Sequence, residues 1–206
     1  MPSKRHMGVT AIATAAGIER EIPEPILAAT RATVLAVGVR RTTLTDVARR
    51  AGVSRMTLYR LVPDVATLVL EVMTREFAAL LDAAEAGSAR RRTARARIVA
   101  TTVEVVRRLP DEALFRRVLD VDPELLLPYL TDRIGSTQRI AVARMRRVLA
   151  EGVADGSVRR TDLDVLATSL VIAVAPFVIS ARLLDEVGRD AALDELTRMV
   201  DAWLAP

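Results

Sequence analysis

Apolar residues recur at spacings of three and four along nearly the whole chain, which is the period of an amphipathic α-helix. Alanine, leucine, arginine and glutamate, all good helix formers, dominate these segments. The alternation typical of strands is almost absent, and glycine and proline mark the breaks. The pattern therefore predicts an all-α protein.

The breaks divide the chain into nine predicted helices. A basic stretch over residues 89–97 leads into the fifth helix, and Pro123 and Pro128 interrupt the segment after the sixth. The expected helices cover 23–38, 43–51, 54–62, 64–87, a segment ending at 109, 110–120, 129–152, 162–187 and 190–203.

The first three predicted helices are short and the later ones are mostly long. This contrast predicts two helical domains joined through the fourth helix. We expect an N-terminal arm over residues 1–22, a small three-helix domain over 23–70 and a larger bundle over 71–206.

The second and third helices carry strong boundary signals. Thr43 and Asp46 have the spacing of a capping box, in which each side chain accepts the backbone N–H of the other residue. Gly52 follows the second helix, where a left-handed residue is favoured, and Ser54 is placed to cap the third helix. Leu58 is expected to face inward. Two helices joined by such a tight glycine turn predict a helix-turn-helix.

The polar face of the third helix has the chemistry of a recognition helix. Arg55 can form two hydrogen bonds to a guanine edge, and Thr57 can contact a base or a thymine methyl group. Tyr59 and Arg60 can bind phosphates. The free N–H groups at the start of the second helix offer another phosphate site. The candidate DNA-binding residues are Arg41, Thr43, Thr45, Ser54, Arg55, Met56, Thr57, Tyr59 and Arg60.

The charge distribution favours the same interpretation. Residues 1–60 hold ten Lys or Arg and four Asp or Glu, a net charge of +6, whereas residues 61–206 have a net charge of −2. Nearly all the basic residues are arginines, whose planar forks suit phosphate and guanine. A basic first third on a nearly neutral body predicts a polyanionic partner, here double-stranded DNA.

Residues 26–77 resemble the DNA-binding segment of the TetR (tetracycline repressor) family of bacterial regulators. The strongest part is the pattern T-x-x-D-V-A-x-x-A-G-V-S-x-x-x-L-Y over residues 43–59. The resemblance implies a homodimer that represses transcription at a near-palindromic operator, with an effector pocket in the C-terminal bundle. The chain departs from the family at Val62 and Val65, which stand where an aromatic residue and a lysine are usual.

The resemblance implies an effector pocket and a dimer interface in the C-terminal domain. The low aromatic content favours a small lipophilic effector over a flat aromatic one. Aliphatic candidates for its pocket are Leu80, Val103, Val106, Leu114, Phe115, Leu119, Met145, Leu149, Leu170 and Phe177. Candidates for the dimer interface, which would form a four-helix bundle, are Leu170, Ala173, Val174, Phe177, Leu196, Val200 and Trp203.

Other classes of protein receive less support. The chain has no cysteine and one histidine, His6, so we expect no metal site, no cofactor and a cytoplasmic location. The uncharged stretch over 165–181 is at the short limit for a membrane span, and we favour a buried interface helix. The carboxylates Asp120, Asp122 and Glu124 could serve an enzyme, but this spacing is also an ordinary helix start. An architectural DNA-binding protein without an effector is the main alternative.

The missing lysine generates a first prediction. Val65→Lys should add one phosphate contact and steepen the dependence of log affinity on log salt by about 0.9 for each added contact. A salt titration of DNA binding by both proteins measures this slope. Equal slopes would refute the proposed role of position 65.

Overall fold

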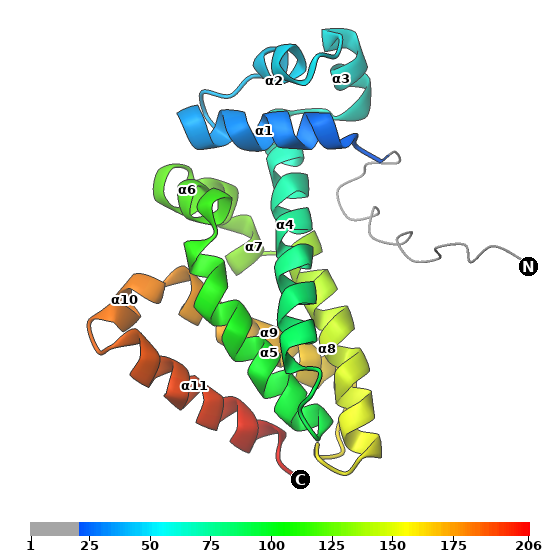
Figure 1. The fold of residues 1–206 in the computed structure, drawn as a ribbon, viewed down its shortest axis with the longest axis vertical. Coiled ribbons are helices and arrows are strands. Elements are labelled where there is room, and N and C mark those ends of the chain that lie inside the picture. Colours follow the sequence, from blue (N-terminus) through cyan, green and yellow to red (C-terminus); the bar gives the residue numbers. More distant parts are fainter. Residues whose placement is uncertain (1–20) are drawn as a thin grey trace, which may run out of the picture.

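The computed structural model describes residues 21–206, which form helices, turns and loops without any strand (Figure 1). The expected all-α class is therefore confirmed. The α-helices are α1 (Glu24–Val37), α2 (Leu44–Ala51), α3 (Arg55–Leu61), α4 (Val65–Ser88), α5 (Ala94–Arg108), α6 (Ala113–Val121), α7 (Pro128–Thr131), α8 (Ser136–Ala154), α9 (Leu163–Ile179), α10 (Ala181–Asp185) and α11 (Arg189–Leu204). Two 3₁₀ turns, η1 (Leu109–Asp111) and η2 (Pro123–Leu125), flank α6.

The caps of the helix-turn-helix form as expected, with one difference. Thr43 Oγ1 accepts the Asp46 N–H at 3.1 Å, and Ser54 Oγ accepts the Thr57 N–H at 3.0 Å. Gly52 is left-handed, with φ 68°. The Asp46 carboxylate, however, accepts the Thr43 hydroxyl at 2.6 Å and Arg49 at 2.8 Å. The reciprocal bond to the Thr43 N–H that we expected is replaced by these two contacts.

The DNA-binding domain is built around one apolar cluster from α1, α2, α3 and the start of α4. Leu58 is fully buried in this cluster, as expected, and Ile22 is also buried there. Ile22 therefore belongs to the packed domain and not to the predicted arm, whose residues 1–20 lie outside the described part. Leu114 and Val118 of α6 complete the cluster, although they lie far along the chain. Figure 1 shows α6 directly beside α1.

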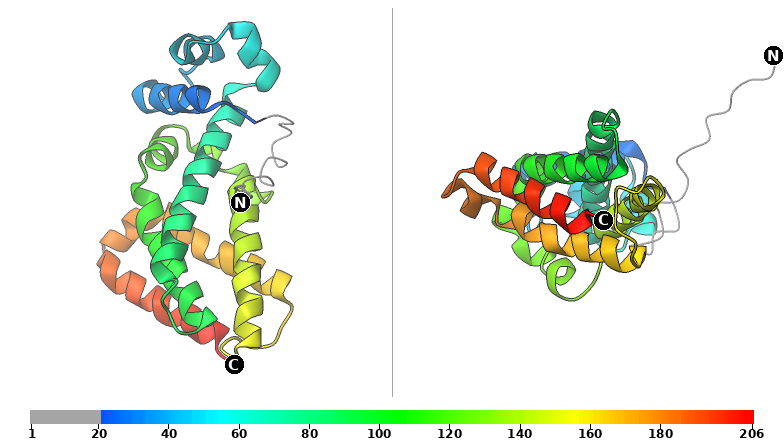
Figure 2. Two further views of the ribbon diagram at one scale, coloured as in Figure 1. Left: turned by 45° about the vertical axis from the view of Figure 1, so that its right-hand side comes forward. Right: turned by 90° about the horizontal axis from the view of Figure 1, so that it is seen from below.

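A second apolar cluster holds the larger bundle together. It joins residues of α5, α8, α9 and α11, including Ile98, Leu149, Leu170 and Leu196. The long helix α4 runs from the DNA-binding domain down the whole bundle (Figure 2). Because α4 is continuous, the two domains share one rigid element.

Two predicted helices are shorter in the structure. The segment predicted over 129–152 is split, since α7 ends at Thr131 and α8 begins only at Ser136. There, Gln138 accepts the Gly135 N–H and donates to the Tyr129 carbonyl, which stabilises a turn. The segment predicted over 162–187 ends at Ile179. Pro176 lies in the last turn of α9 and has no N–H to donate, and α10 follows as a separate helix.

The inclusion of α6 in the first cluster makes a testable prediction. Leu114 is 1% exposed, so Leu114→Ala should lower the free energy of unfolding by about 2–5 kcal/mol. Chemical denaturation of the full chain measures the loss. A change below about 0.5 kcal/mol, the range of ordinary surface substitutions, would contradict the packing described for α6.

Candidate DNA interface and ligand cavity

The outer face of α3 presents a row of exposed side chains. Leu58 points into the core, and the opposite face exposes Arg55, Met56, Tyr59 and Arg60. Met56 is 71% exposed and Tyr59 is 47% exposed, which is unusual for large apolar or aromatic groups. These four predicted residues are therefore available to a partner.

Two of these side chains are held together before any partner binds. The Arg55 guanidinium lies 5.2 Å from the centre of the Tyr59 ring, and its nitrogen is 3.5 Å from the Tyr59 hydroxyl. A cation over an aromatic face is attracted to it, which restricts the rotamers of both groups. Thr57 is only half-exposed, and its hydroxyl is 2.8 Å from the Ser54 hydroxyl. Thr57 and Ser54 thus form the cap of α3 as well as part of its surface.

The start of α2 forms the second part of the surface. Thr43 and Thr45 are exposed there, beside the free N–H groups of the first turn. Arg41 is also exposed, and its Nε donates to the carbonyl of Val37 at 2.9 Å, which holds the side chain near the end of α1. The neighbouring Arg40 is engaged differently, because it forms an ion pair with Glu124 at 2.6 Å. Arg41 is thus the arginine of this turn that has no acidic partner among residues 21–206.

A cavity of about 650 Å³ lies within the C-terminal domain. Its walls come from α4, α5, α6, α8 and α9, together with the turn between α7 and α8. On α4 they extend from Thr67 to Glu85, which is about 27 Å of helix at about 1.5 Å per residue. The cavity is therefore elongated along the bundle. Four of the ten predicted pocket residues line it: Val106, Phe115, Met145 and Leu170.

The other six predicted pocket residues lie outside these walls. Leu149 is completely buried in the apolar cluster of the bundle, and Val103 and Phe177 are partly buried residues that pack against this cluster. Leu114 belongs to the DNA-binding core, and Leu80 is buried elsewhere on α4. Leu119 lines a smaller hollow beside α10. An inward apolar residue has the same sequence pattern whether it packs against protein or borders a cavity, so the sequence could not separate them.

Polar groups that the periodicity did not indicate also line the cavity. At the end of the cavity that is remote from α3, Arg97 pairs with Glu151 at 2.5 Å, and Arg144 pairs with Asp82 and Glu85. Burial lowers the pKa of Arg144, but its hydrogen bond to Asp82 and the charge of Glu85 outweigh this effect and raise the pKa above its ordinary value. These arginines are therefore neutralised by protein carboxylates. Nearer the DNA-binding domain, Tyr129, Arg133, Gln138, Arg139 and the buried Thr102 border the space.

Comparison with known proteins identifies the family. Residues 26–72 match the family model described as bacterial regulatory proteins of the tetR family. An uncharacterized HTH-type transcriptional regulator of Mycobacterium bovis is 34% identical over 180 residues, covering 87% of this chain and 92% of the relative. A Mycobacterium tuberculosis regulator described in the same way is 33% identical over the same coverage. This chain belongs to the TetR family. It is a DNA-binding transcriptional regulator and not an enzyme.

Solved structures agree on the fold of this TetR-family protein. The transcriptional repressor QsdR of R. erythropolis has a TM-score of 0.66 at 21% identity, covering 87% of this chain and 92% of that one. The regulator FadR of Bacillus subtilis, solved in complex with stearoyl-CoA, has a TM-score of 0.57 at 12% identity, covering 87% and 98%. At these identities the likeness concerns the fold alone.

The predicted dimer residues divide into two groups in this TetR-family chain. Leu170, Leu196 and Val200 are at most 2% exposed and pack inside the single chain, so they are corrected to core residues. Val174 and Phe177 are half-buried beside that core. Ala173 is exposed, and Trp203 is 37% exposed.

Exposed apolar side chains also occur on α9 and α11, on other sides of these helices than the core residues. Val165 and Ile172, both on one side of α9, are 61% and 62% exposed, and Met199 of α11 is 51% exposed. These residues and Trp203 are exposed apolar side chains of α9 and α11, and we call them the outer apolar face. No helix among residues 21–206 is both long and apolar enough to cross a membrane. No group of metal-ligating side chains occurs within the same range.

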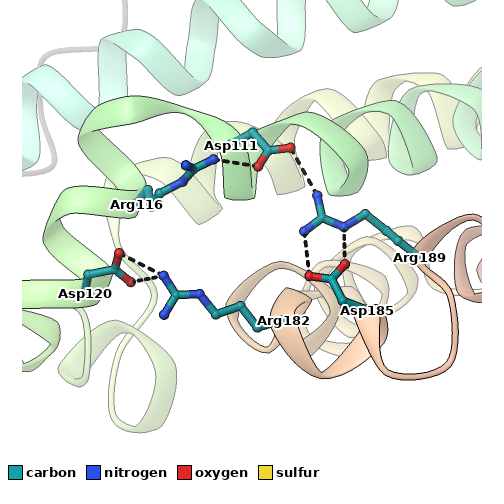
Figure 3. A network of polar contacts seen from close by, with 6 residues as sticks. All are labelled: Asp111, Arg116, Asp120, Arg182, Asp185 and Arg189. Carbon is teal, nitrogen blue, oxygen red and sulfur yellow. Dashed lines mark hydrogen bonds and ion pairs between the residues drawn. The ribbon is translucent and has the colours of Figure 1, made fainter.

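An ion-pair network joins α6 to the last two helices (Figure 3). Arg182 of α10 donates to both oxygens of Asp120, at 2.7 and 2.9 Å. Arg189 of α11 contacts Asp111 at 3.1 Å and Asp185 at 2.9 Å. The hydrogen bond that Arg189 donates to Asp185, opposed only in part by burial, raises the pKa of Arg189 above its ordinary value. The network ties α10 and α11 to the helix that completes the DNA-binding core.

The different partners of Arg40 and Arg41 make a matched test. Arg41→Ala should reduce the slope of log affinity against log salt by about 0.9, the value for one phosphate contact. Arg40→Ala should leave the slope unchanged, because its guanidinium is occupied by Glu124. Salt titrations of both variants decide this. An equal reduction in the two slopes would refute the assignment of Arg41 as the phosphate contact.

Proposed function

We propose that this protein is a homodimeric transcriptional repressor that binds a near-palindromic operator and is released by a small lipophilic effector. The observation that carries the proposal is the exposed face of α3, where Arg55 and Tyr59 are already paired and lie at the end of the molecule remote from the bundle. Such a helix fits the major groove and can read a guanine with Arg55.

The outer apolar face supports the dimeric part of the proposal. Val165, Ile172, Met199 and Trp203 are large apolar side chains that a single chain leaves exposed to water. Two copies related by a twofold axis would bury this surface against itself. A twofold dimer places its two recognition helices about one turn of DNA apart, which accounts for a near-palindromic operator.

The cavity supports the effector part of the proposal. Its walls include Val105, Val106, Leu170 and Val174, and its length suits an extended apolar molecule. FadR from Bacillus subtilis was solved in complex with stearoyl-CoA, whose acyl chain is an extended apolar group. That ligand is a property of FadR. A small lipophile with a polar end near Tyr129 and Gln138 is the class of effector that we propose.

Helix α6 supplies the route from effector to DNA. Phe115 faces the cavity, whereas its neighbour Leu114 is buried in the DNA-binding core. A ligand that displaces Phe115 must therefore disturb the packing of α6 against the core of the DNA-binding domain. The ligand can shift the protein towards release only by its difference in affinity for the two conformations.

Selection from random DNA duplexes tests the proposal. The purified wild type should enrich a twofold symmetric motif, and Arg55→Ala should lose about 1–3 kcal/mol of discrimination at one base pair of each half-site. Binding that depends on salt but enriches no motif would refute the proposal and favour the architectural alternative. Tyr59→Phe, which keeps the ring but removes the hydroxyl, is the matched control for loss of a phosphate contact.

The outer apolar face provides a separate prediction. Ile172→Arg should give a folded protein that is monomeric by sedimentation, because a charge cannot be buried in an apolar interface without a partner. Its operator affinity should fall at least about tenfold, since each half-site is then bound alone. Arg146→Ala, an exposed change on α8, serves as a control that should remain dimeric. A dimeric Ile172→Arg protein would place the interface elsewhere.

A further inference from the structure

Asp122 is a buried carboxylate that joins the two domains. It lies just after α6 and is only 2% exposed, which is rare for an aspartate. Its Oδ2 accepts the Val39 N–H at 2.8 Å, and its Oδ1 accepts the Arg40 N–H at 3.3 Å. Both amides belong to the turn between α1 and α2. The carboxylate of the effector domain thus supplies acceptors for backbone groups of the DNA-binding domain.

The negative charge of Asp122 is compensated within the same turn. Arg40 Nε lies 3.7 Å from Asp122 Oδ1, and the Arg40 guanidinium pairs with the exposed Glu124. Hydrogen bonds to an ionised acceptor are stronger than neutral ones. Loss of the carboxylate would leave two backbone N–H groups without their partner at a partly buried site, which is costly.

Gly38 shows how closely the turn and Asp122 approach each other. Gly38 has φ +84°, a conformation that residues with side chains rarely adopt. A Cβ atom at this position would lie 3.2 Å from Asp122 Oδ2 and 3.4 Å from Val121. Thr42 Oγ1 donates to the Gly38 carbonyl at 2.7 Å and closes the turn from the other side. The turn is therefore shaped to receive the carboxylate.

We propose that Asp122 is a positioning residue for DNA recognition, which fixes the orientation of the helix-turn-helix on the body of the protein. In the dimer this orientation sets the distance and the angle between the two recognition helices. Asp122 thereby makes the protein selective for the spacing of operator half-sites. The inference rests on the proposed dimeric binding of an operator.

The other links between the domains are less directional. Leu114 and Val118 contact the DNA-binding core through apolar surface, whose attraction does not depend on angle. Helix α4 connects the two domains covalently, and the DNA-binding domain can rotate about the axis of this helix. The hydrogen bonds of Asp122 depend on angle and act at a second point, away from that axis. On its other side α6 is held by the bond between Asp120 and Arg182 (Figure 3). The hydrogen bonds of Asp120 and Asp122 thus connect α10, through α6, to the turn before α2.

The test compares binding to the selected operator and to the same operator with one base pair inserted at its centre. The insertion moves and rotates one half-site relative to the other, so the wild type should bind the longer site at least about tenfold more weakly. In Asp122→Ala this ratio should fall to about threefold or less, because the small domains can adjust to either spacing. Affinity for an isolated half-site should be unchanged.

A ratio of affinities separates positioning from simple loss of stability. A protein that is only less stable binds both operators more weakly by the same factor, which leaves the ratio at the wild-type value. Asp122→Asn should give an intermediate ratio, since the amide oxygen can accept one of the two N–H groups. Gly38→Ala, which pushes the turn away from the carboxylate, should reduce the ratio without changing Asp122 itself.

Glu124→Ala is the matched control. It removes an exposed carboxylate from the same segment and should keep the wild-type ratio. Asp122→Ala and Gly38→Ala proteins that both retain the wild-type ratio would overturn the inference while leaving dimeric recognition intact. A wild type that binds both operators equally would instead overturn the proposed rigid dimer, and the role of Asp122 with it.

Discussion

The arrangement of this protein depends on the packing of α6 against the DNA-binding domain. Leu114 and Val118 complete the apolar core of a domain whose other buried members lie before residue 73 of the chain. A three-helix domain of this size buries little surface by itself, so contributions from α4 and α6 matter to its stability. As a consequence, the DNA-binding domain cannot change its position without changing the contacts of α6.

The same helix meets the two other functional parts of the molecule. Phe115 borders the cavity, and Asp120 is bound by Arg182 next to the helices of the outer apolar face. One nine-residue helix therefore contacts the domain that binds DNA, the space proposed for the effector and α10, the short helix between α9 and α11. These contacts of α6 give a physical reason why a ligand in the bundle can act on a recognition helix that it does not touch.

The sequence predicted best what is determined locally. The caps at Thr43 and Ser54 and the left-handed Gly52 depend on neighbours within a few residues, and a helix-turn-helix follows from them. The cavity walls, the buried side of α9 and the partners of Asp122 depend on tertiary packing. Asp120, Asp122 and Glu124 illustrate this limit, because their spacing indicated an ordinary helix start or a weak catalytic cluster. In the structure Asp120 contacts α10, whereas Asp122 accepts backbone N–H groups of the turn after α1 and Glu124 pairs with the Arg40 side chain of that turn.

Hydroxyl-radical footprinting of the protein on its selected operator tests the central claim most directly. Two recognition helices held by one rigid dimer should protect two patches on the same side of the duplex, with centres about one helical turn or slightly more apart. Both patches should appear together as protein is added. A single patch, or protection spread evenly along the DNA, would contradict the account.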